Sequence, residues 1–382
     1  MRIPFFFRLK MLRHFFLGKA ALYPIKNYNE MGGSTELMAS HLFESHMQNT
    51  VLSNNKIQLV RAPSVRHFHL RNTIVNINCS SLIKNNVIYM DRINENEKAH
   101  EGFIHFHTKD YALVKKRVDE VIEAGLFLGG NGSWNWFHYL IEILPKLMFS
   151  DQINEKTLLV SSIIHKFPSM QASLNCMIDS NQWKIIYLDP SKNYLVKNLD
   201  FITDINKVEF NKINLLNKTL PTAYFRPDIT RKTAQKLAEH QSSSYESSES
   251  SKIFLWREGT HRIARNQQEV FAKLEQLGFK KLDPSKLSFE QQITVYRSAK
   301  IIIGISGAAW ANLIFCQENT NAIIFSPESS SDFTGFSNLS VIFKVNLINI
   351  TYKTNELNHS ESGFEINQEK LFVILKNYFF IN

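Results

Sequence analysis

The chain has 382 residues, of which 44% are hydrophobic and 21% are charged. Such a composition builds packed domains, two or three at this length, and excludes a chain that is disordered throughout. Lys and Arg outnumber Asp and Glu by 44 to 35, and the resulting net charge of +9 favours anionic partners. No nucleic-acid recognition motif accompanies this charge, so we expect no nucleic-acid partner.

The motif content argues against a cofactor. The three cysteines, Cys79, Cys176 and Cys316, are odd in number and widely spaced, unlike a disulfide framework or a zinc site. The sequence contains no CxxC, HExxH or P-loop motif. We expect no metal, no other cofactor and a reducing, cytoplasmic location.

The first 22 residues mix aromatic and basic side chains. Their apolar runs are too short to span a bilayer, and they lack the continuous apolar stretch and cleavage site of a secretory signal. Such a segment can lie peripherally on the inner face of an anionic membrane, and the alternative is a buried first element with a frayed basic start. We treat residues 1–56 as a separate N-terminal segment.

Residues 57–239 are expected to form an N-terminal α/β domain. Up to residue 125 the chain contains short strand-like runs, at Ile57–Val60, Thr73–Ile77 and Val87–Met90. Later in the domain, strands alternate with helical segments. The expected elements are strands at Thr157–Val160, Trp183–Leu188 and Leu195–Phe201 and a helix at Pro168–Ile178. This alternation predicts a parallel sheet with helices on its faces.

A glycine-rich turn and the apolar helix after it stand out within this domain. The turn is residues 129–132, and the helix is expected to run to about Leu147, with Pro145 kinking or ending it. At 3.6 residues per turn, its few polar side chains fall within roughly 80° of one another. They are Asn135, His138, Glu142 and Lys146. This stripe indicates either the solvent edge of a core helix or one wall of a cleft.

The serine-rich residues 240–252 are typical of a linker or surface loop. The second domain, residues 253–355, is expected to alternate strands and helices, and residues 356–382 to end in a helix that packs back on the body. Its expected strands are Ile253–Trp256, Phe279–Leu282, Lys300–Gly304, Ala322–Phe325, Ile342–Val345 and Leu347–Ile350. Its expected helices are Gln267–Leu277 closed by Gly278, one opened by a capping box at Ser288, and Trp310–Phe315.

Two loops of the second domain have the composition of an anion site. The small residues Ser306-Gly307-Ala308 follow a buried strand and open a helix, where backbone N–H groups bind anions. Arg257 follows another strand at the same sheet edge, Arg262 lies in the loop after it, and Asn266 caps the next helix. Guanidinium groups suit a diphosphate through bidentate hydrogen bonds. The alternatives are tight strand–helix packing and, for the arginines, a solvated basic loop.

Residues 304–308, Gly-Ile-Ser-Gly-Ala, also nearly match the nucleophile elbow GxSxG of serine hydrolases. Asp332 and His359 follow in the chain order of a hydrolase triad. Against this reading, Ala308 replaces the last glycine, no oxyanion loop is evident, and His138 has no role. A serine hydrolase that uses Ser306 stays open as an alternative.

Two blocks of the sequence resemble glycosyltransferase family 61. The first is Asn135-Trp136-Phe137-His138-Tyr139-Leu140-Ile141-Glu142-Ile143-Leu144-Pro145-Lys146-Leu147. The second runs from Arg257-Glu-Gly-Thr-His-Arg262-Ile-Ala-Arg-Asn266 through Leu274–Phe279, Leu287–Gln291 and Ala299–Gly304 to Gly307-Ala308-x-x-x-Asn312. The resemblance covers about residues 125–330. The family includes O-GlcNAc and xylosyl transferases of the eukaryotic secretory pathway and enzymes of bacterial capsular polysaccharide biosynthesis.

The resemblance implies a GT-B-like α/β fold, with two Rossmann-like domains facing each other across a cleft. It implies an inverting, metal-independent transfer from a nucleotide sugar to an oligosaccharide or lipid-linked glycan acceptor, in capsular or lipopolysaccharide surface polysaccharide biosynthesis. The residues it assigns to the nucleotide sugar are Arg257 and Arg262 for the diphosphate, Ser306, Gly307 and Ala308 for backbone contacts, Asn312 for shaping that loop, and Asn135 and Asn266.

An inverting transfer needs a base for the acceptor hydroxyl. We expect His138 to be that base, with Glu142 orienting its imidazole or acting instead. The chain departs from the family at Ser306, where members often have His, and at Ile324-Phe325, where they often have an acidic residue. A contact to the donor is then remade, donor choice is shifted, or activity is lost, and the last case leaves a non-catalytic glycan-binding subunit as an alternative.

Overall fold

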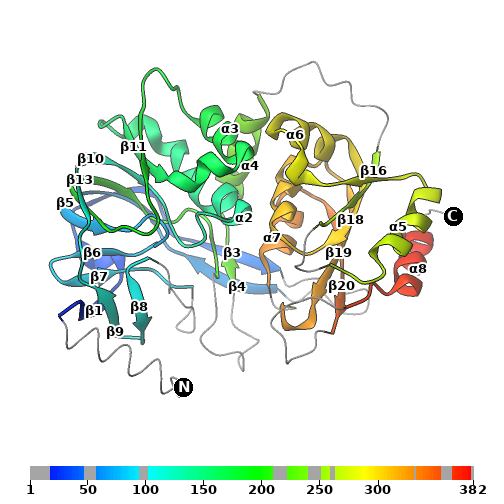
Figure 1. Cartoon of the computed structure of the whole chain (residues 1–382), viewed down its shortest axis with the longest axis horizontal. Coiled ribbons are helices and arrows are strands. Elements are labelled where there is room, and N and C mark those ends of the chain that lie inside the picture. Colours follow the sequence, from blue (N-terminus) through cyan, green and yellow to red (C-terminus); the bar gives the residue numbers. More distant parts are fainter. Residues whose placement is uncertain are drawn as a thin grey trace. The chain divides into compact units, whose positions relative to one another are not determined.

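The computed structural model describes residues 18–46, 57–93, 102–209, 222–239, 251–258, 263–330, 333–353 and 364–379. Within these ranges the chain is a mixed α/β protein, as predicted (Figure 1). Its internal contacts divide it into two compact units. Unit 1 comprises residues 1–42 and 61–220, and unit 2 comprises residues 43–60 and 221–382.

Unit 1 is built on an 11-stranded mixed sheet in the order β12-β11-β10-β13-β5-β6-β7-β1-β9-β8, with β2 beside β5. The strands are β1 (Ala20–Lys26), β2 (Ser34–Met38), β5 (Val65–Val75), β6 (Leu82–Lys84), β7 (Val87–Tyr89), β8 (Ile104–His107), β9 (Tyr111–Lys115), β10 (Glu120–Leu128), β11 (Thr157–Ser161), β12 (Lys184–Leu188) and β13 (Tyr194–Ile202). Strands β1 and β2 lie where the sequence indicated no strand, because all their side chains except Ala20 are exposed or only partly buried and so lack a clear apolar period.

Strands β10 to β13 form the parallel part of this sheet, in the order β12-β11-β10-β13. Numbered along the chain, this order is 3-2-1-4, so the direction of winding reverses between β10 and β13. The segments α2 (Trp136–His138), η2 (Tyr139–Ile143) and η3 (Leu144–Gln152) follow β10, and η4 (Ser162–Lys166) and α3 (Pro168–Met177) follow β11. The predicted parallel sheet with intervening helices is confirmed here.

The helix after the glycine-rich turn is longer and less regular than the sequence predicts. It starts with one α-helical turn, widens to a π-helical turn at η2 and tightens to a 3₁₀ helix along η3. Pro145 lies at the start of η3 and therefore marks a change of helix type rather than the end of the helix. Its missing N–H is tolerated there because the first N–H groups of a helical segment need no intrahelical partner.

Unit 2 contains a five-stranded, fully parallel sheet in the order β17-β16-β18-β19-β20. Its strands are β16 (Ser251–Leu255), β17 (Phe279–Leu282), β18 (Ala299–Ile305), β19 (Asn321–Pro327) and β20 (Asn346–Tyr352). Numbered along the chain, the order is 2-1-3-4-5, that of a doubly wound fold with its reversal between β16 and β18. The short strands β3 (His41–His46) and β4 (Ile57–Ala62) pair with each other, and β14 (Lys207–Val208) and β15 (Ala223–Tyr224) are shorter still.

Helices cover both faces of the sheet in unit 2 (Figure 1). On one face, α5 (Gln267–Gln276) and α8 (Gln368–Phe379) pack on Ile301, Ile303 and Ile305 of β18. The other face carries α6 (Phe289–Ser298), η6 (Ala308–Phe315) and α7 (Gly335–Ile342). The remaining helical segments are η1 (Tyr28–Met31), α4 (Pro227–Glu239), η5 (Pro284–Lys286) and η7 (Glu328–Ser330).

The local signals in unit 2 are confirmed with two exceptions, the first being that Asn266 precedes α5 but its side chain makes no capping hydrogen bond. Ser288 and Gln291 form the predicted capping box of α6, and Gly278 follows α5 with a φ of +84°. The strand predicted at Ile342–Val345 is wrong, because Ile342 is the last residue of α7 and the chain turns at Phe343 and Lys344 before β20. The buried residues Phe336, Leu339 and Ile342 of α7 recur every third position, which is helical rather than strand spacing.

Gly129, the first residue after β10, provides a test of the glycine-rich turn. A Cβ there would lie 2.6 Å from both the Ile77 carbonyl oxygen and the Phe127 ring, and neither can move freely. We expect Gly129→Ala to lower the free energy of unfolding by about 1–3 kcal/mol in urea titrations. Gly278→Asn is the control, because its position is open and Asn tolerates positive φ, and it should cost at most about 1 kcal/mol. Equal effects of the two substitutions would contradict the proposed close approach.

Candidate functional site

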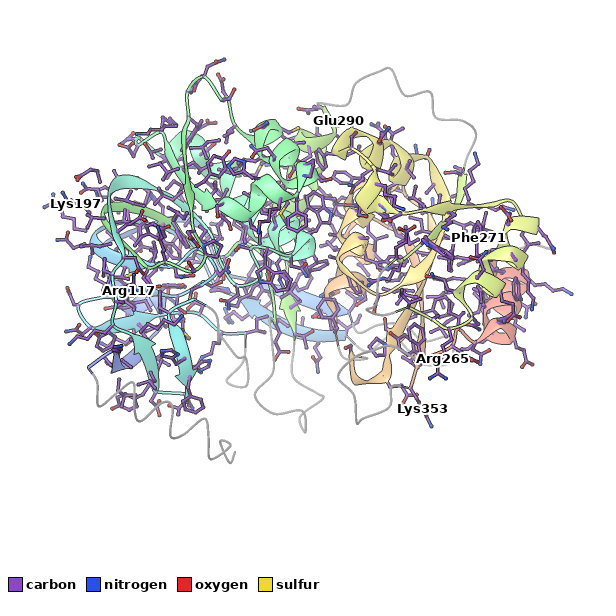
Figure 2. All side chains as sticks on the ribbon, in the orientation of Figure 1. Arg117, Lys197, Arg265, Phe271, Glu290 and Lys353 are labelled. Carbon is purple, nitrogen blue, oxygen red and sulfur yellow. The ribbon has the colours of Figure 1, made fainter. Side chains whose placement is uncertain are left out.

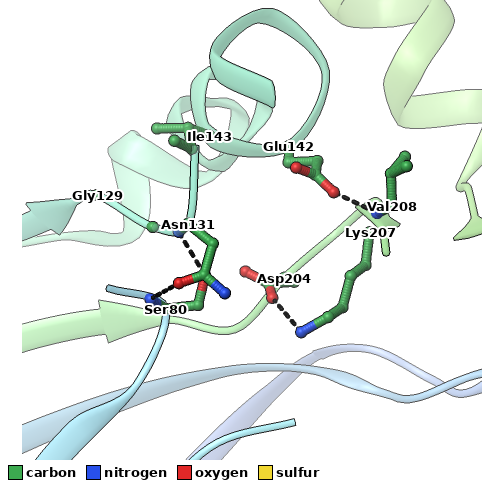
Figure 3. A pocket seen from close by; sticks show the side chains of 9 residues that line it. Ser80, Gly129, Asn131, Glu142, Ile143, Asp204, Lys207 and Val208 are labelled. Atoms are coloured by element: carbon green, nitrogen blue, oxygen red, sulfur yellow. Dashed lines mark hydrogen bonds and ion pairs between the residues drawn. The ribbon is translucent and has the colours of Figure 1, made fainter. Parts of the chain in front are cut away.

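A small pocket opens in unit 1 where β10 and β13 end side by side (Figure 3). The residues that line it are Ser80, Gly129, Gly130, Asn131, Glu142, Ile143, Asp204, Lys207 and Val208. This is the point at which the strand order of the parallel part reverses. In open α/β sheets, ligands bind at the carboxyl ends of the strands at such a point.

The glycine-rich turn is tied down by reciprocal hydrogen bonds. The Asn131 N–H donates to Ser80 Oγ at 2.9 Å, and the Ser80 N–H donates to Asn131 Oδ1 at 3.1 Å (Figure 3). Two residues on, Ser133 Oγ donates to Asn78 Oδ1 at 2.6 Å. Asn135 then caps the helix, because its Oδ1 accepts the Phe137 N–H at 2.9 Å. The structure thus uses Asn135 to start the helix that carries His138.

His138 and Glu142, the predicted catalytic pair, are in contact. His138 Nδ1 lies 2.5 Å from Glu142 Oε2, and the other oxygen, Oε1, accepts the backbone N–H of Val208. The side chains are only 13% and 11% exposed, so the pair is largely shielded from water. When Nδ1–H donates to the carboxylate, the lone pair of the neutral imidazole is on Nε2. The arrangement is that of a general base held by an orienting acid.

The polar stripe continues into a buried network of charges. Lys146 is 2% exposed and its Nζ lies 2.9 Å from Asp204 Oδ1, while Lys207 Nζ lies 3.5 Å from Asp204 Oδ2. Burial alone would raise the pKa of Asp204, but the two lysines outweigh it and hold that pKa below its usual value. The stripe is therefore not the solvent edge of a core helix.

Asp204 and Lys207 were missed by the sequence analysis. They belong to no motif and do not come from the helix: Asp204 lies in the loop after β13, and Lys207 begins β14. The signal that could have found them is topological. Both follow a predicted strand, and the carboxyl end of a strand at a reversal point is where functional side chains gather.

In unit 2, the structure brings Arg257 together with the loop after β18, as predicted. Arg257 follows β16, and its Nη2 donates to the Ser306 carbonyl oxygen at 2.7 Å. The guanidinium lies against Gly307, where a Cβ would be 1.6 Å from Nη2. Gly307 is therefore needed for the approach of Arg257, and both lie at the reversal point between β16 and β18.

The other predicted residues of unit 2 have varied surroundings. The Ser306 N–H donates to the Phe325 carbonyl at 2.8 Å, so this amide is already engaged. Ala308 opens η6, and the first N–H groups of a helix lack intrahelical partners. Asn312 is fully buried, and its Nδ2 donates to Gln292 Oε1 at 2.9 Å, which links η6 to α6.

The structure describes only part of the predicted basic loop between β16 and α5. Asn266 uses both amide atoms on the backbone of Ile366, at 2.9 Å each, and so anchors the chain before α8. Arg265 is exposed (Figure 2). Arg262 lies outside the described residues.

The hydrolase alternative gains nothing from the structure. Ser306 is 6% exposed and its backbone does not adopt the positive φ that marks a strained turn. Asp332 and His359 both lie outside the described residues.

Comparison with known proteins decides between a glycosyltransferase and a serine hydrolase. The family model described as Glycosyltransferase 61 matches residues 136–323. Residues 136–323 are a glycosyltransferase family 61 domain. The match includes His138, Glu142, Arg257 and the loop at Ser306, and it confirms the family recognised from the two sequence blocks. No relative among curated proteins matches the chain.

The glycosyltransferase 61 match makes the chain a glycosyltransferase, which uses a sugar donor and a glycan acceptor. Among the residues that the structure describes, no group of three or more His, Cys, Asp or Glu side chains is placed to hold a metal ion. Within the same part of the chain, no helix is long and apolar enough to cross a membrane.

Asp91, just after β7, makes the buried network sensitive to pH. Burial raises the pKa of this carboxyl from 3.8 to about 6, and Lys207 offsets the effect only in part. Between these values the folded state holds a proton that the unfolded state has lost, so stability falls as the pH rises through that window. We expect Asp91→Asn to abolish this fall and to gain at most about 3 kcal/mol at pH 7 relative to the wild type.

Urea unfolding between pH 4 and pH 7 measures the effect of Asp91→Asn. Asp110→Asn removes an exposed carboxylate of the same unit and is the matched control. Asp204 and Asp200 have lowered pKa values and change the stability of both proteins alike, so the measured quantity is the difference between Asp91→Asn and the wild type. A difference that does not grow as the pH rises from 4 to 7 would contradict the raised pKa of Asp91.

Proposed function

We propose that this glycosyltransferase is an inverting, metal-independent enzyme. It would move a sugar from a nucleotide sugar to an oligosaccharide or lipid-linked glycan acceptor in capsular or lipopolysaccharide assembly. The observation that carries the proposal is the 2.5 Å contact between His138 Nδ1 and Glu142 at the end of β10. The family supplies the reaction class, and this contact supplies a base for it.

In the proposed reaction, His138 Nε2 takes the proton of the acceptor hydroxyl as its oxygen attacks the anomeric carbon of the donor. The bond between that carbon and the phosphate oxygen breaks, and the nucleoside diphosphate leaves with the electron pair. Glu142 stabilises the imidazolium that forms, because its carboxylate already accepts the Nδ1–H. Attack opposite the leaving group inverts the anomeric centre.

The leaving diphosphate needs positive charge, which a metal-independent enzyme takes from side chains and helix N-termini. Arg257 fits this role, because its guanidinium is held against Gly307 at the carboxyl edge of the sheet in unit 2. We further propose the GT-B arrangement that the family resemblance implies, in which the acceptor side with His138 and the donor side with Arg257 face each other across a cleft.

Paired substitutions test this assignment. A thermal-shift panel of nucleotide sugars first identifies the donor, since saturation at 100 times Kd adds about 2.7 kcal/mol of stability. With that donor, His138→Ala should lower kcat by at least ~10², the scale for losing a general base. Arg257→Ala should lower kcat/KM by at least ~10², because the leaving group loses its cation.

Two control variants keep the residue type and leave the site. His165→Ala removes a histidine that stacks on Tyr187 in unit 1, and Arg265→Ala removes an exposed arginine of unit 2. Both should retain near wild-type turnover. Near wild-type turnover in His138→Ala and Arg257→Ala as well would refute the proposed mechanism.

We also propose peripheral contact with the inner face of an anionic membrane, and hence a cytoplasmic location. The support is a mixed apolar and basic surface on β1 and β9 of unit 1. Leu22 is 58% and Tyr111 52% exposed, and the register of β1 and β9 places them two rungs apart, on the same face of the sheet. The exposed lysines beside them are Lys19, Lys115 and Lys116. Apolar tips flanked by cations suit an anionic lipid surface.

Vesicle sedimentation tests the membrane contact. Binding to vesicles that contain phosphatidylglycerol should fall at least ~10-fold in Lys115→Glu/Lys116→Glu, since each basic residue contributes about 1 kcal/mol at such a surface. Lys280→Glu/Lys281→Glu reverses an adjacent exposed pair in unit 2 and should bind as the wild type does. If vesicle binding falls equally in both variants, the loss reflects net charge alone, and the proposed membrane surface is refuted.

A further inference from the structure

A second pocket in unit 1 plays no part in the site described above. It holds about 460 Å³, and its lining residues are His67, His69, Ala124, Gln152, Asn154, Glu155, Asn198 and Asp200. Its floor is the face of three neighbouring strands, β5, β13 and β10. One wall is the end of η3 and the loop that leads into β11.

Asp200 organises the floor of this pocket. Its Oδ1 accepts hydrogen bonds from His67 Nε2 at 2.8 Å and from His69 Nδ1 at 3.2 Å. Burial would raise the pKa of Asp200, but the two imidazole hydrogen bonds outweigh it and lower that pKa. The carboxylate is thus ionised and only accepts hydrogen bonds, which makes both imidazoles donors toward it.

The lining favours one class of ligand. Seven of the eight lining residues carry a polar side chain, and these comprise two imidazoles, two carboxylates and three carboxamides. These lining residues include no Lys or Arg, so phosphate groups and nucleotides are poor ligands. Ala124 is the one apolar side chain among them and is too small a surface for an acyl chain. Neutral hydroxyl groups both donate and accept, and they match a wall that mixes amides, carboxylates and imidazole nitrogens.

The pocket shares two strands with the candidate catalytic site. Ala124 precedes the end of β10 at Leu128 by four residues, and Asp200 precedes Asp204 by four residues. Four strand residues correspond to about 13 Å. A chain of linked sugars can bridge such a distance, whereas a single sugar cannot occupy both places.

We propose that this pocket binds a neutral saccharide unit of the glycan acceptor, away from the hydroxyl that receives the new sugar. The choice of a saccharide rests on the proposed function, and the pocket's chemistry supports it independently. Binding there would hold a growing chain while its end reaches His138. Acceptors long enough to fill the pocket would then bind more tightly than short ones.

The test measures the binding of neutral disaccharides in the absence of donor, by saturation-transfer NMR and calorimetry. The probes are lactose, cellobiose, xylobiose and N,N′-diacetylchitobiose at millimolar concentration. At least one should bind the wild type, and Gln152→Ala/Asn154→Ala should weaken it at least ~5-fold, because each lost hydrogen bond contributes about 0.5–1.5 kcal/mol. Asn198→Ala, on the floor, should weaken it as well.

The matched control is Gln171→Ala/Asn175→Ala. These two carboxamides hydrogen-bond to each other on α3, outside the pocket, and their loss should leave the dissociation constant unchanged. The proposal is overturned if none of the disaccharides binds, or if the control weakens binding as much as the pocket variant does.

The same measurement separates this proposal from the proposed reaction. Disaccharide binding should survive in His138→Ala, which keeps the pocket intact. If His138→Ala and Arg257→Ala keep full turnover while the pocket variant loses binding, the catalytic assignment fails and the saccharide site stands. If turnover collapses in His138→Ala and Arg257→Ala while no disaccharide binds the wild type, the saccharide site fails and the catalytic assignment stands.

Discussion

The site in unit 1 depends on one largely buried carboxylate, Asp204, held between two buried lysines. Lys146 comes from η3 and Lys207 from β14, and Lys207 also donates to the Asp91 carbonyl at 2.6 Å. Charges in a protein interior are costly unless each has its partner, and removal of one partner typically costs about 3–5 kcal/mol. The helix, the loop after β13 and the end of β7 are therefore fixed relative to one another.

This network also determines where Glu142 points. Val208, which donates its N–H to Glu142, directly follows Lys207 in the chain. Because Lys207 is held by Asp204, the backbone of Val208 is held as well, and Glu142 is fixed from both its oxygens. The orientation of His138 is thus the last step of a chain of contacts that begins in the core.

Both units place a glycine where their strand order reverses. A Cβ at Gly129 would meet the Ile77 carbonyl, and a Cβ at Gly307 would meet the Arg257 guanidinium. Neither position requires a left-handed backbone, since Gly129 has no positive φ and the φ of Gly307 is 166°. What both require is room, and the absence of a side chain lets the chain pass close to its neighbours.

The sequence predicted those features that depend on local pattern. The capping box at Ser288, the glycine after α5 and the helical stripe with His138 and Glu142 all rest on contacts between residues close in sequence. The approach of Arg257 to Ser306 was predictable because parallel strands place their carboxyl ends at one edge. The same reasoning failed for Asp204, since its partner Lys146 lies 58 positions away and no local pattern relates them.

The strands and helices that were misjudged have a physical explanation as well. At the end of α7, the β-branched pair Val341-Ile342 favours a strand, and only the spacing of the buried apolar residues Phe336, Leu339 and Ile342 reveals the helix. In β1, partial burial on one side and exposure on the other left too little contrast for an alternating pattern.

The two departures from the family can now be weighed against the structure. Ile324 and Phe325 are 0% and 1% exposed, so an acidic residue at either position would be a buried charge in this chain. At Ser306 it is the backbone that makes the contacts: its carbonyl accepts Arg257 and its N–H donates to Phe325. A change of side chain at position 306 therefore leaves the placement of Arg257 intact. This argues for a remade donor contact rather than for a lost activity, because Arg257, the cation we propose for the leaving diphosphate, remains in place.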